Sequence, residues 1–430
     1  IELLRHTGAT FRLGTGLHDV NSMGDHRISA FGPTGGIMGF VHFHHYVTRE
    51  VLLGQDVKFN DYSATAVAAR NGRFIRPEDA AGKLPPISYG LNLNTEKLAQ
   101  LMCKNAMING VGVARGRLDS VQLSPDGSCI QSLHLDDGTT LDADFYIDCS
   151  GENAALIGAA LGVGYVDWSP WLPCSRAIGV TAKTAHDDVP VHHCTATDRG
   201  WLLNTPLQHR SACRFLYSPE DVSDADAATT IRDSLGLEDP EALAMSDAHS
   251  GHRERFWHAN CVAMGPAGGS VESLELSSFH LLQSAVLRLA RMWPTNPVQP
   301  QLATEYNRAT ANEFECLRDF TILRYLKAGW RSGPFWQRVA GVTPPDSLVA
   351  RIELFRSRGR IVPGEQDIFP RETWVAALLA AEQWPRGYDP LLDSMDSSQL
   401  QQHFANMKVA IAQAVQKMPA HREYLSNLTS

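Results

Sequence analysis

The chain has 430 residues and a formal net charge of −9, because 47 acidic side chains outnumber 38 basic ones. A hydrophobic fraction of 43% and a charged fraction of 20% are typical of a globular protein with one large domain or two interlocked ones. The acidic excess argues against nucleic acid as a partner. The chain also has no block of Lys and Arg residues of the kind that binds an anionic membrane surface. No apolar run reaches the ~20 residues that span a bilayer. We therefore expect small-molecule chemistry.

The eight cysteines form no CxxC pair, which argues against a zinc site. We expect these scattered cysteines to act as small buried apolar side chains, which is typical of a protein in a reducing cytoplasm. Three histidines, His42, His44 and His45, form an HxHH cluster. On a strand His42 and His44 would face the same side, but no carboxylate or cysteine stands at ligand spacing. We expect a structural or substrate-lining role for them and no metal.

Helix and hairpin signals follow in chain order. Residues 95–108 carry a helical apolar stripe that ends near Asn109 and Gly110. Between residues 113 and 147, short alternating runs are separated by turn sequences at 125–127 and 137–138, which predict antiparallel hairpins. Beyond residue 300 the chain is predicted to be mainly helical, with aromatic anchors at Trp330, Phe335, Trp336, Trp374 and Trp384.

Two segments have the pattern strand, small-residue turn, helix. The first is a strand at 144–148, a turn through Cys149, Ser150 and Gly151, and a helix at 153–161. The second is a strand at 261–264 followed by Gly265, Pro266, Ala267, Gly268 and Gly269, and then a helix with apolar Phe279, Leu282, Val286 and Leu289. Such units present backbone N–H groups to a phosphate or a ring oxygen, and two of them suggest a nucleotide-cofactor fold. A tight turn with a purely structural role is the alternative at each.

Several longer stretches occur in an order that is typical of one family. They are GATFRLG (8–14), AFGPTGG with HFHHY (30–46), DYSATAVAARNGRF (61–74), ISYGLNLN (87–94), DADFYIDCSG (142–151), GWLLNTPLQHR (200–210), WHANCVAMGPAGGSVESLELSSFHLLQSA (257–285) and MPAHREYL (418–425). In combination they resemble the flavin-dependent tryptophan halogenase family.

This resemblance implies an α/β (α+β) fold, with a glutathione-reductase-like, Rossmann-type FAD-binding domain and an interlocked helical substrate module. We expect an FAD/halogenase core at 1–290, with substrate-facing segments within 8–94 and 165–255, and a mainly helical C-terminal module at 291–430 that packs on the core. The family's N-terminal GxGxxG fingerprint is not found in this chain. We interpret this as a truncated chain, a fragment in which the first Gly-rich βα unit is missing, and such a fragment would bind FAD poorly.

The resemblance also implies a cytoplasmic oxidoreductase that halogenates an aromatic, indole-like substrate. FAD would arrive as FADH2 from a separate, transiently bound flavin reductase and react with O2 to a flavin hydroperoxide. Chloride or bromide would attack this peroxide to give hypohalous acid. A homodimer is left open.

The family pattern assigns roles to individual residues. The flavin ring is expected against Gly265, Pro266, Ala267, Gly268 and Gly269, with Ser150 and Gly151 as further cofactor contacts. Halide is expected at the backbone amides of Ser277 and Ser278, in a helix that starts near Leu274. Glu275 matches the acidic catalytic residue, and Phe31 and Trp201 are expected at the substrate. Each assignment has a structural alternative. The residues around the flavin and halide could form a tightly packed turn, Glu275 could be a carboxylate favoured by the helix dipole, and Phe31 could be an ordinary core residue.

The chain departs from the family at several positions. The family's catalytic lysine falls at or near Gly16, and no lysine occurs between Ile1 and Val57. Arg12 is cationic nearby, but a guanidinium is a poor nucleophile. Ser29 stands where the family has a histidine, Leu276 replaces a serine, and only the first and last residues of the WxWxIP signature remain at 201–206. Three hypotheses follow: a halogenase with altered or reduced activity, a flavin-dependent monooxygenase on the same fold, or a catalytically silent flavin-binding homologue.

Overall fold

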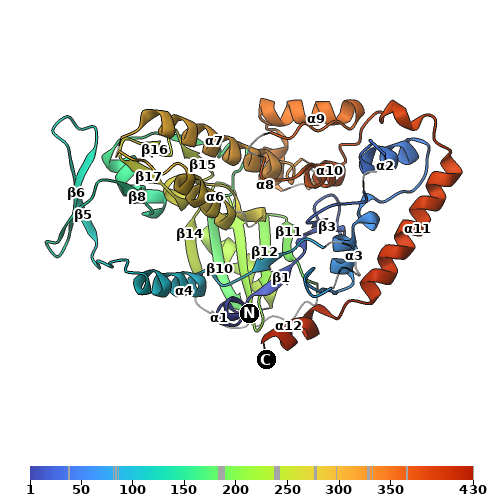
Figure 1. The fold of residues 1–430 in the computed structure, drawn as a ribbon, viewed down its shortest axis with the longest axis horizontal. Helices are drawn as coiled ribbons and strands as arrows, with labels where there is room; N and C mark the ends of the chain where they lie inside the picture. The colour runs from blue at the N-terminus through green and yellow to red at the C-terminus, as the bar shows by residue number, and fades with distance from the viewer. Residues whose placement is uncertain are drawn as a thin grey trace.

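A seven-stranded sheet forms the centre of the protein in the computed structural model (Figure 1). The structure describes residues 1–429 except 37–38, 81, 83–84, 86, 183–188, 237–242, 276–277, 297, 327–329, 332 and 365–366. The strand order is β14-β10-β13-β12-β11-β2-β3, so β3 and β14 are the edges. The bounds are β2 Gly14–His18, β3 His26–Ala30, β10 Arg176–Ala182, β11 His192–Thr197, β12 Gly200–Pro206, β13 Ser211–Tyr217 and β14 Ala244–Asp247. Only the β11–β2 pair is parallel among the described strands of this sheet.

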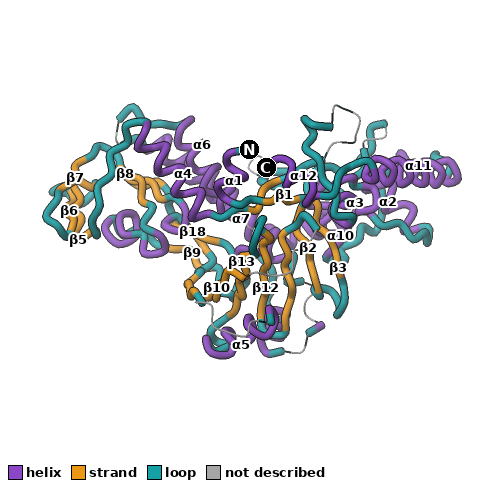
Figure 2. The backbone as a smooth tube through the Cα atoms, turned by 90° about the horizontal axis from the view of Figure 1, so that it is seen from below, coloured by secondary structure: helices purple, strands orange, loops and turns teal. Residues whose placement is uncertain are grey.

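Different helices cover the two faces of the large sheet. Helix α5 (Asp224–Leu235) packs on β10 and β13, where Phe215 and Ile231 belong to one apolar cluster. The opposite face carries Leu17 and Trp201, which belong to the main core together with side chains of α7 (Pro300–Ile322). Figure 2 shows α5 and α7 on opposite sides of the sheet. Because side chains alternate along a strand, neighbours in the sequence serve different cores.

The second glycine-rich unit lies in a smaller sheet, β16-β17-β8. Strand β17 (Cys261–Ala263) runs parallel to β8 (Tyr146–Asp148), and β16 is Trp257–His258. The two predicted strand–turn–helix units are therefore neighbours, as a Rossmann-like fold requires. The fold class inferred from the sequence is confirmed by this arrangement and by the solved relatives described below.

The predicted hairpins between residues 113 and 147 are also confirmed. Strands β5 (Leu118–Leu123), β6 (Ile130–Leu135) and β7 (Thr140–Asp142) form an antiparallel sheet that projects at one end of the molecule (Figure 1). The remaining small sheets are β18-β15-β9 and β1-β4. Their bounds are β1 Thr10–Arg12, β4 Gly90–Asn92, β9 Tyr165–Asp167, β15 Gly251–Arg253 and β18 Gly269–Ser270.

The predicted helix at 95–108 is α4 (Thr95–Ile108), with Asn94 capping its N-terminus. Helix α6 (Ser278–Arg291) confirms half of the predicted apolar stripe, because Leu289 is buried and Leu282 is partly buried against the main core. Phe279 and Val286 are 43% and 48% exposed, and Leu281 and Ala285 are buried instead. The prediction was wrong for Phe279 and Val286 because α6 carries apolar residues on more than one side, and only packing against α7 and the core selects the buried one.

The C-terminal part is mainly helical, as predicted, and shares the main core with the large sheet. One apolar cluster runs from Leu17 to Phe404 and so includes residues on both sides of position 290. The other helices are α1 Glu2–Thr7, α2 Phe43–Leu52, α3 Ala64–Arg70, α8 Pro334–Ala340, α9 Asp346–Arg358, α10 Arg371–Ala380, α11 Ser397–Gln416 and α12 His421–Thr429. The division into a core at 1–290 and a module at 291–430 remains a proposal. No helix among the described residues is long and apolar enough to cross a membrane.

Candidate functional site

Glu275 lies at the centre of a buried polar cluster. Its Oε2 accepts a hydrogen bond from Thr15 Oγ1 at 3.0 Å, and its Oε1 accepts one from Arg324 Nε at 2.8 Å. Glu275 ends a short helical turn, Ser273–Glu275, and the described part of α6 begins at Ser278. A helix start near Leu274 therefore stays a prediction. The carboxylate is held by Thr15 of β2 and by Arg324, which follows α7.

Arg12 is the N-terminal cation of this cluster. Its Nη2 donates to the main-chain oxygen of Glu275 at 3.1 Å and to Thr15 Oγ1 at 2.8 Å. Its guanidinium lies over the ring of Phe31, 5.2 Å from the centroid. Burial lowers the pKa of Arg12 to about 10, while the charge of Glu275 acts in the opposite direction. Arg12 therefore stays protonated at neutral pH and acts as a hydrogen-bond donor.

Arg324 is a site residue that the sequence analysis missed. Its side chain is 3% exposed, it pairs with Glu275 at 2.7 Å, and its Nη2 donates to Ser29 Oγ at 3.1 Å. Ser29 therefore accepts a hydrogen bond from the second arginine of the cluster, Arg324. The family resemblance predicts a histidine at this position. No motif marks Arg324, which lies 49 residues after Glu275. The packing of α7 against the sheet brings the two together.

Gly16 lies on the other side of the sheet from Glu275. Thr15 faces Glu275, whereas a Cβ atom on Gly16 would lie 3.1 Å from Val191 Cγ2 and 3.2–3.3 Å from ring nitrogens of His18 and His193. A side chain at position 16 would therefore point away from the carboxylate. This geometry does not support Gly16 as the lysine position, and the cation that contacts Glu275 from this segment is Arg12.

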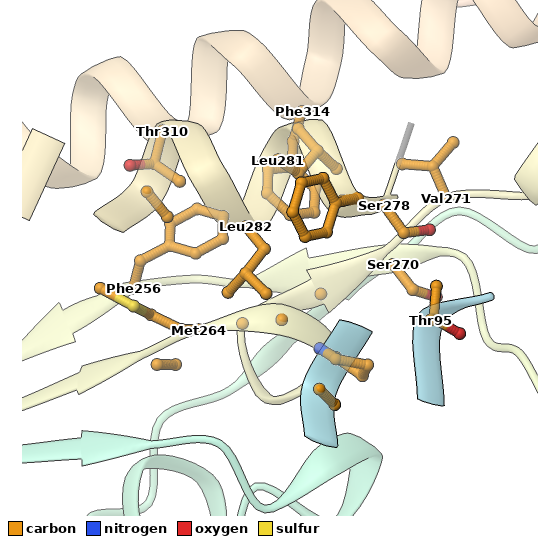
Figure 3. Close-up of a pocket in the computed structure, with 18 of the residues that line it drawn as sticks. Thr95, Phe256, Met264, Ser270, Val271, Ser278, Leu281, Leu282, Thr310 and Phe314 are labelled. Carbon is orange, nitrogen blue, oxygen red and sulfur yellow. The ribbon is translucent and has the colours of Figure 1, made fainter. Parts of the chain in front are cut away.

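The loop at 265–269 borders an apolar cavity of about 340 Å³ (Figure 3). Its lining includes Gly265, Pro266, Gly268, Gly269, Phe256, Met264, Leu282, Phe314 and residues of α4. Gly265 and Gly269 have φ of +61° and +153°, which side chains rarely allow, so bare backbone approaches the cavity there. An apolar space floored by glycine backbone fits the ring of a flavin. None of the residues described as lining it is Lys or Arg, so it offers the pyrophosphate no basic side chain.

The halide and the remaining cofactor residues lie around this loop. Ser278 begins α6 and borders the cavity, whereas Ser277 and Leu276 lie outside the described residues. Ala267 is buried beneath the loop and is not among the residues that line the cavity. The cofactor and halide assignments therefore remain predictions.

The turn at Ser150 and Gly151 is occupied by a carboxylate of the protein. Asp148 Oδ2 accepts from the N–H groups of Leu156 and Ile157, both at 2.9 Å, and Oδ1 accepts from Ser150 N–H at 3.0 Å. Those two donors at the start of the helical turn Ala155–Ala160 are therefore not available to a phosphate. The expectation that this turn offers free N–H groups to an anion is corrected for them.

Phe31 and Trp201 occupy different environments. Phe31 lies beside Arg12 at the edge of the Glu275 cluster. Trp201 is fully buried in the main core, where its ring packs edge-on against Tyr325 and Trp336 at centroid distances of 5.4 and 5.3 Å. It does not border the cavity beside 265–269.

A second buried carboxyl group lies three residues before Glu275. Glu272 accepts a hydrogen bond from Cys174 N–H at 2.7 Å and makes a short hydrogen bond with the Tyr325 hydroxyl. Burial raises the pKa of Glu272 to about 7, although these hydrogen bonds act in the opposite direction. Tyr325 follows Arg324 directly, so this pair fixes the chain beside the Glu275–Arg324 ion pair.

The HxHH cluster lies on a helix rather than on a strand. His42 precedes α2, and its Nε2 contacts Arg371 Nη1 at 2.7 Å, while His44 Nε2 pairs with the carbonyl oxygen of Gly359 at 2.7 Å. Burial lowers the pKa of His44 to about 3 and that of His45 to about 4. Among the described residues, no group of three or more His, Cys, Asp or Glu side chains is arranged to hold a metal ion.

Comparisons with known proteins agree on one family. Residues 1–397 match a family model described as tryptophan halogenase. Tryptophan 6-halogenase SttH of Streptomyces toxytricini is 26% identical over 351 residues, which cover 79% of this chain and 66% of SttH, just under two thirds of its length. Among solved structures, the flavin-dependent halogenase BrvH of Brevundimonas sp. BAL3 is 31% identical with a TM-score of 0.93, covering 100% of this chain and 88% of BrvH. The flavin-dependent halogenase Xcc4156 of Xanthomonas campestris is also 31% identical with a TM-score of 0.93, covering 99% and 85%.

Proposed function

Because this chain belongs to the tryptophan halogenase family, we propose that it is part of a flavin-dependent halogenase that acts on an aromatic, indole-like substrate. The observation that carries the proposal is the buried cluster in which Thr15 and Arg324 hold the Glu275 carboxylate next to Arg12. A carboxylate beside a permanent cation can orient a polar oxidant and accept a proton from an aromatic ring.

The reduced cofactor would supply two electrons to O2, which is the oxidant of the halide. FADH2 from a separate reductase, together with O2, chloride or bromide and one proton, would give FAD, water and hypohalous acid. The loop at 265–269 would hold the flavin ring in the apolar cavity, with the halide near Ser277 and Ser278. Ser150 and Gly151 remain candidate contacts to the rest of the cofactor.

Arg12 and Glu275 have complementary roles in the halogen transfer. The Arg12 guanidinium donates a hydrogen bond to the oxygen of the hypohalous acid, which makes the halogen more electrophilic. As the aromatic carbon bonds to the halogen, the oxygen leaves as hydroxide beside Arg12. Glu275 takes the proton lost by that carbon and passes it to the hydroxide, so the products are the aryl halide and water. Phe31 lies beside Arg12, where an aromatic substrate could stack.

The test is a product analysis. The complete protein is supplied with FAD, a flavin reductase, NADH, bromide and a panel of indoles, and the products are identified by mass spectrometry. We expect a brominated indole, and we expect Glu275→Gln to lower its yield at least about a hundredfold, as loss of a catalytic proton acceptor does. Reduced-flavin consumption without a brominated product would contradict the proposal.

A monooxygenase is the second candidate, and the identity of the cation favours it. No lysine contacts Glu275 among the described residues, and the guanidinium of Arg12 stays protonated, so it is a poor covalent carrier of halogen. In the same assay this candidate predicts an oxygen-bearing indole that also forms without bromide. A catalytically silent homologue predicts neither product.

A further inference from the structure

A second cavity lies mainly on the face of the large sheet that does not carry the Glu275 cluster. It has a volume of about 730 Å³ and is bordered by β2, the edge strand β3 and β11, together with residues 56–61, α3 and α10. Gly16 and His193 form part of its floor, whereas Thr15 points to Glu275 on the other face. Its size falls in the range of small-molecule pockets.

Three histidines form a hydrogen-bonded chain along this cavity. His26 Nδ1 lies 2.8 Å from His18 Nδ1, and His18 Nε2 lies 2.9 Å from His193 Nδ1. The chain runs from the exposed ring of His26 through the half-buried His18 to His193, which is 9% exposed. Gly16 leaves room for it, because a Cβ there would lie 3.2–3.3 Å from the two bonded nitrogens of His18 and His193.

A hydrogen bond to the outermost ring, His26, determines which nitrogen carries the proton in each of the three histidine rings. Each N···N contact needs one N–H and one lone pair. A group that donates to Nε2 of His26 leaves the Nδ1–H of His26 to donate to His18, and the Nε2–H of His18 to donate to His193. One donor therefore fixes the tautomers of all three rings without adding a charge.

The charged side chains around the cavity balance one another. Asp25 pairs with Arg27 at 2.9 Å, and Asp61 pairs with Arg70 at 3.0 Å. Asp56 and Lys58, which are exposed, contribute one charge of each sign. The rest of the lining is largely apolar and includes the rings of Phe59 and Trp384. This charge balance favours an uncharged ligand with an aromatic body.

We propose that this cavity binds a neutral aromatic molecule that carries one ring N–H or O–H group, which donates to His26 at the end of the His26–His18–His193 chain. The site is separate from the Glu275 cluster, because Thr15 and Gly16 face opposite sides of β2. It therefore does not depend on the proposed halogenation.

Fluorine NMR titrations with 5-fluoroindole and 5-fluoro-1-methylindole test the proposal without flavin or halide. We expect saturable binding of both probes, with 5-fluoroindole about fivefold tighter, since N-methylation removes one hydrogen bond. His26→Phe keeps a ring but removes the nitrogen, so it should reduce the affinity for 5-fluoroindole to that of the methylated probe. The exposed His209, which does not line the cavity, provides the matched control, and His209→Phe should keep the fivefold difference.

Two further variants locate the binding. Gly16→Val fills the floor, and Leu379→Trp fills the α10 wall in case the first variant folds poorly; in a protein with a native circular dichroism spectrum, either should abolish the binding that depends on His26. Glu275→Gln alters the other face and should leave this His26-dependent binding unchanged. Absence of saturable binding, equal affinity for the two probes, or loss of binding in Glu275→Gln but not in Leu379→Trp would overturn the proposal. Because no turnover is measured, failure of the halogenase proposal would leave these outcomes unaffected.

Discussion

Thr15 and Gly16 are neighbours in the sequence, but they serve opposite faces of the large sheet. The Thr15 hydroxyl bonds to Glu275, while Gly16 makes room for His18 and His193. A substitution at either position therefore affects only one of the two sites.

The first prediction concerns a lysine beside Glu275. Arg12→Lys places an amine that can lose its proton and carry halogen where the guanidinium now lies, so we expect the yield of brominated indole to rise. A tenfold rise corresponds to only about 1.4 kcal/mol of barrier, which mass-spectrometric product analysis detects easily.

Gly16→Lys is the comparison for that experiment. Its side chain would face the second cavity, so we expect no rise in yield and some loss of stability from the crowding at Val191. If Gly16→Lys raised the yield and Arg12→Lys did not, the assignment of Arg12 to the halogen-transfer site would be wrong.

The buried Glu272 should make stability depend on pH. Its pKa rises from 4.5 to about 7 on folding, so between these values the folded protein holds a proton that the unfolded chain has released. The free energy of unfolding therefore falls as the pH rises from about 5 to 8, by about 3 kcal/mol from this group. Urea unfolding at several pH values measures the effect.

Glu272→Gln imitates the protonated carboxyl group, because its amide can accept from Cys174 N–H and donate to the Tyr325 oxygen. We expect this variant to be the more stable protein at pH 8 and to lose less stability than the parent between pH 5 and 8. Parallel pH profiles for the two proteins would show that Glu272 is ionised throughout this range.

The two strand–turn–helix units differ in what their turns expose. After β8, Asp148 bonds to the N–H groups that a helix start would otherwise offer to an anion. After β17, none of the described residues that line the cavity is acidic, and bare glycine backbone borders it. The second unit is thus the better place for a cofactor ring, although both have the same local pattern in the sequence.

The loop at 265–269 should lose its flavin when a side chain is added at Gly268. Gly268 has an ordinary helical conformation with φ of −83°, but a Cβ there would lie 3.1 Å from Phe256 Cδ1 and 3.3 Å from the carbonyl oxygen of Ala263. Gly268→Val should therefore abolish flavin uptake, measured by fluorescence titration, at a cost in stability of about 1–3 kcal/mol.

Gly341 provides the control, since its φ of −82° is similar and it lies at the exposed end of α8. Gly341→Val should leave flavin uptake unchanged. Normal flavin affinity in Gly268→Val would move the cofactor site away from this loop.

At the scale of the whole molecule, the large sheet separates two environments, and the apolar cavity proposed for the flavin ring lies outside the sheet. The Glu275 cluster occupies one face, the histidine chain lies on the other, and the apolar cavity lies between α4, α6 and the loop after β17. The described residues that line this cavity offer a flavin ring apolar contacts, and none of them is a basic side chain that could pair with a pyrophosphate.

This lining predicts how strongly the protein binds flavins with and without phosphate groups. The 430-residue protein should bind riboflavin and FAD with affinities within about tenfold of each other, because the ring supplies the contacts and no phosphate is paired. Quenching of flavin fluorescence measures both affinities. FAD binding more than a hundredfold tighter than riboflavin would reveal a phosphate site that the cavity lining does not contain.

The amino-acid sequence by itself determined the local elements and the family. Turn residues and apolar spacing were enough for the β5–β7 hairpins, the helix at 95–108 and the two strand–turn–helix units, because each depends on neighbours within a few residues. The order of the motifs identified the family, and through it Glu275. The tertiary structure decided which side of α6 is buried and which cations meet Glu275. Arg12 and Arg324 lie 263 and 49 residues from Glu275 in the chain. Only the packing of α7 and β2 brings Arg12 to the main-chain oxygen of Glu275 and Arg324 to its carboxylate.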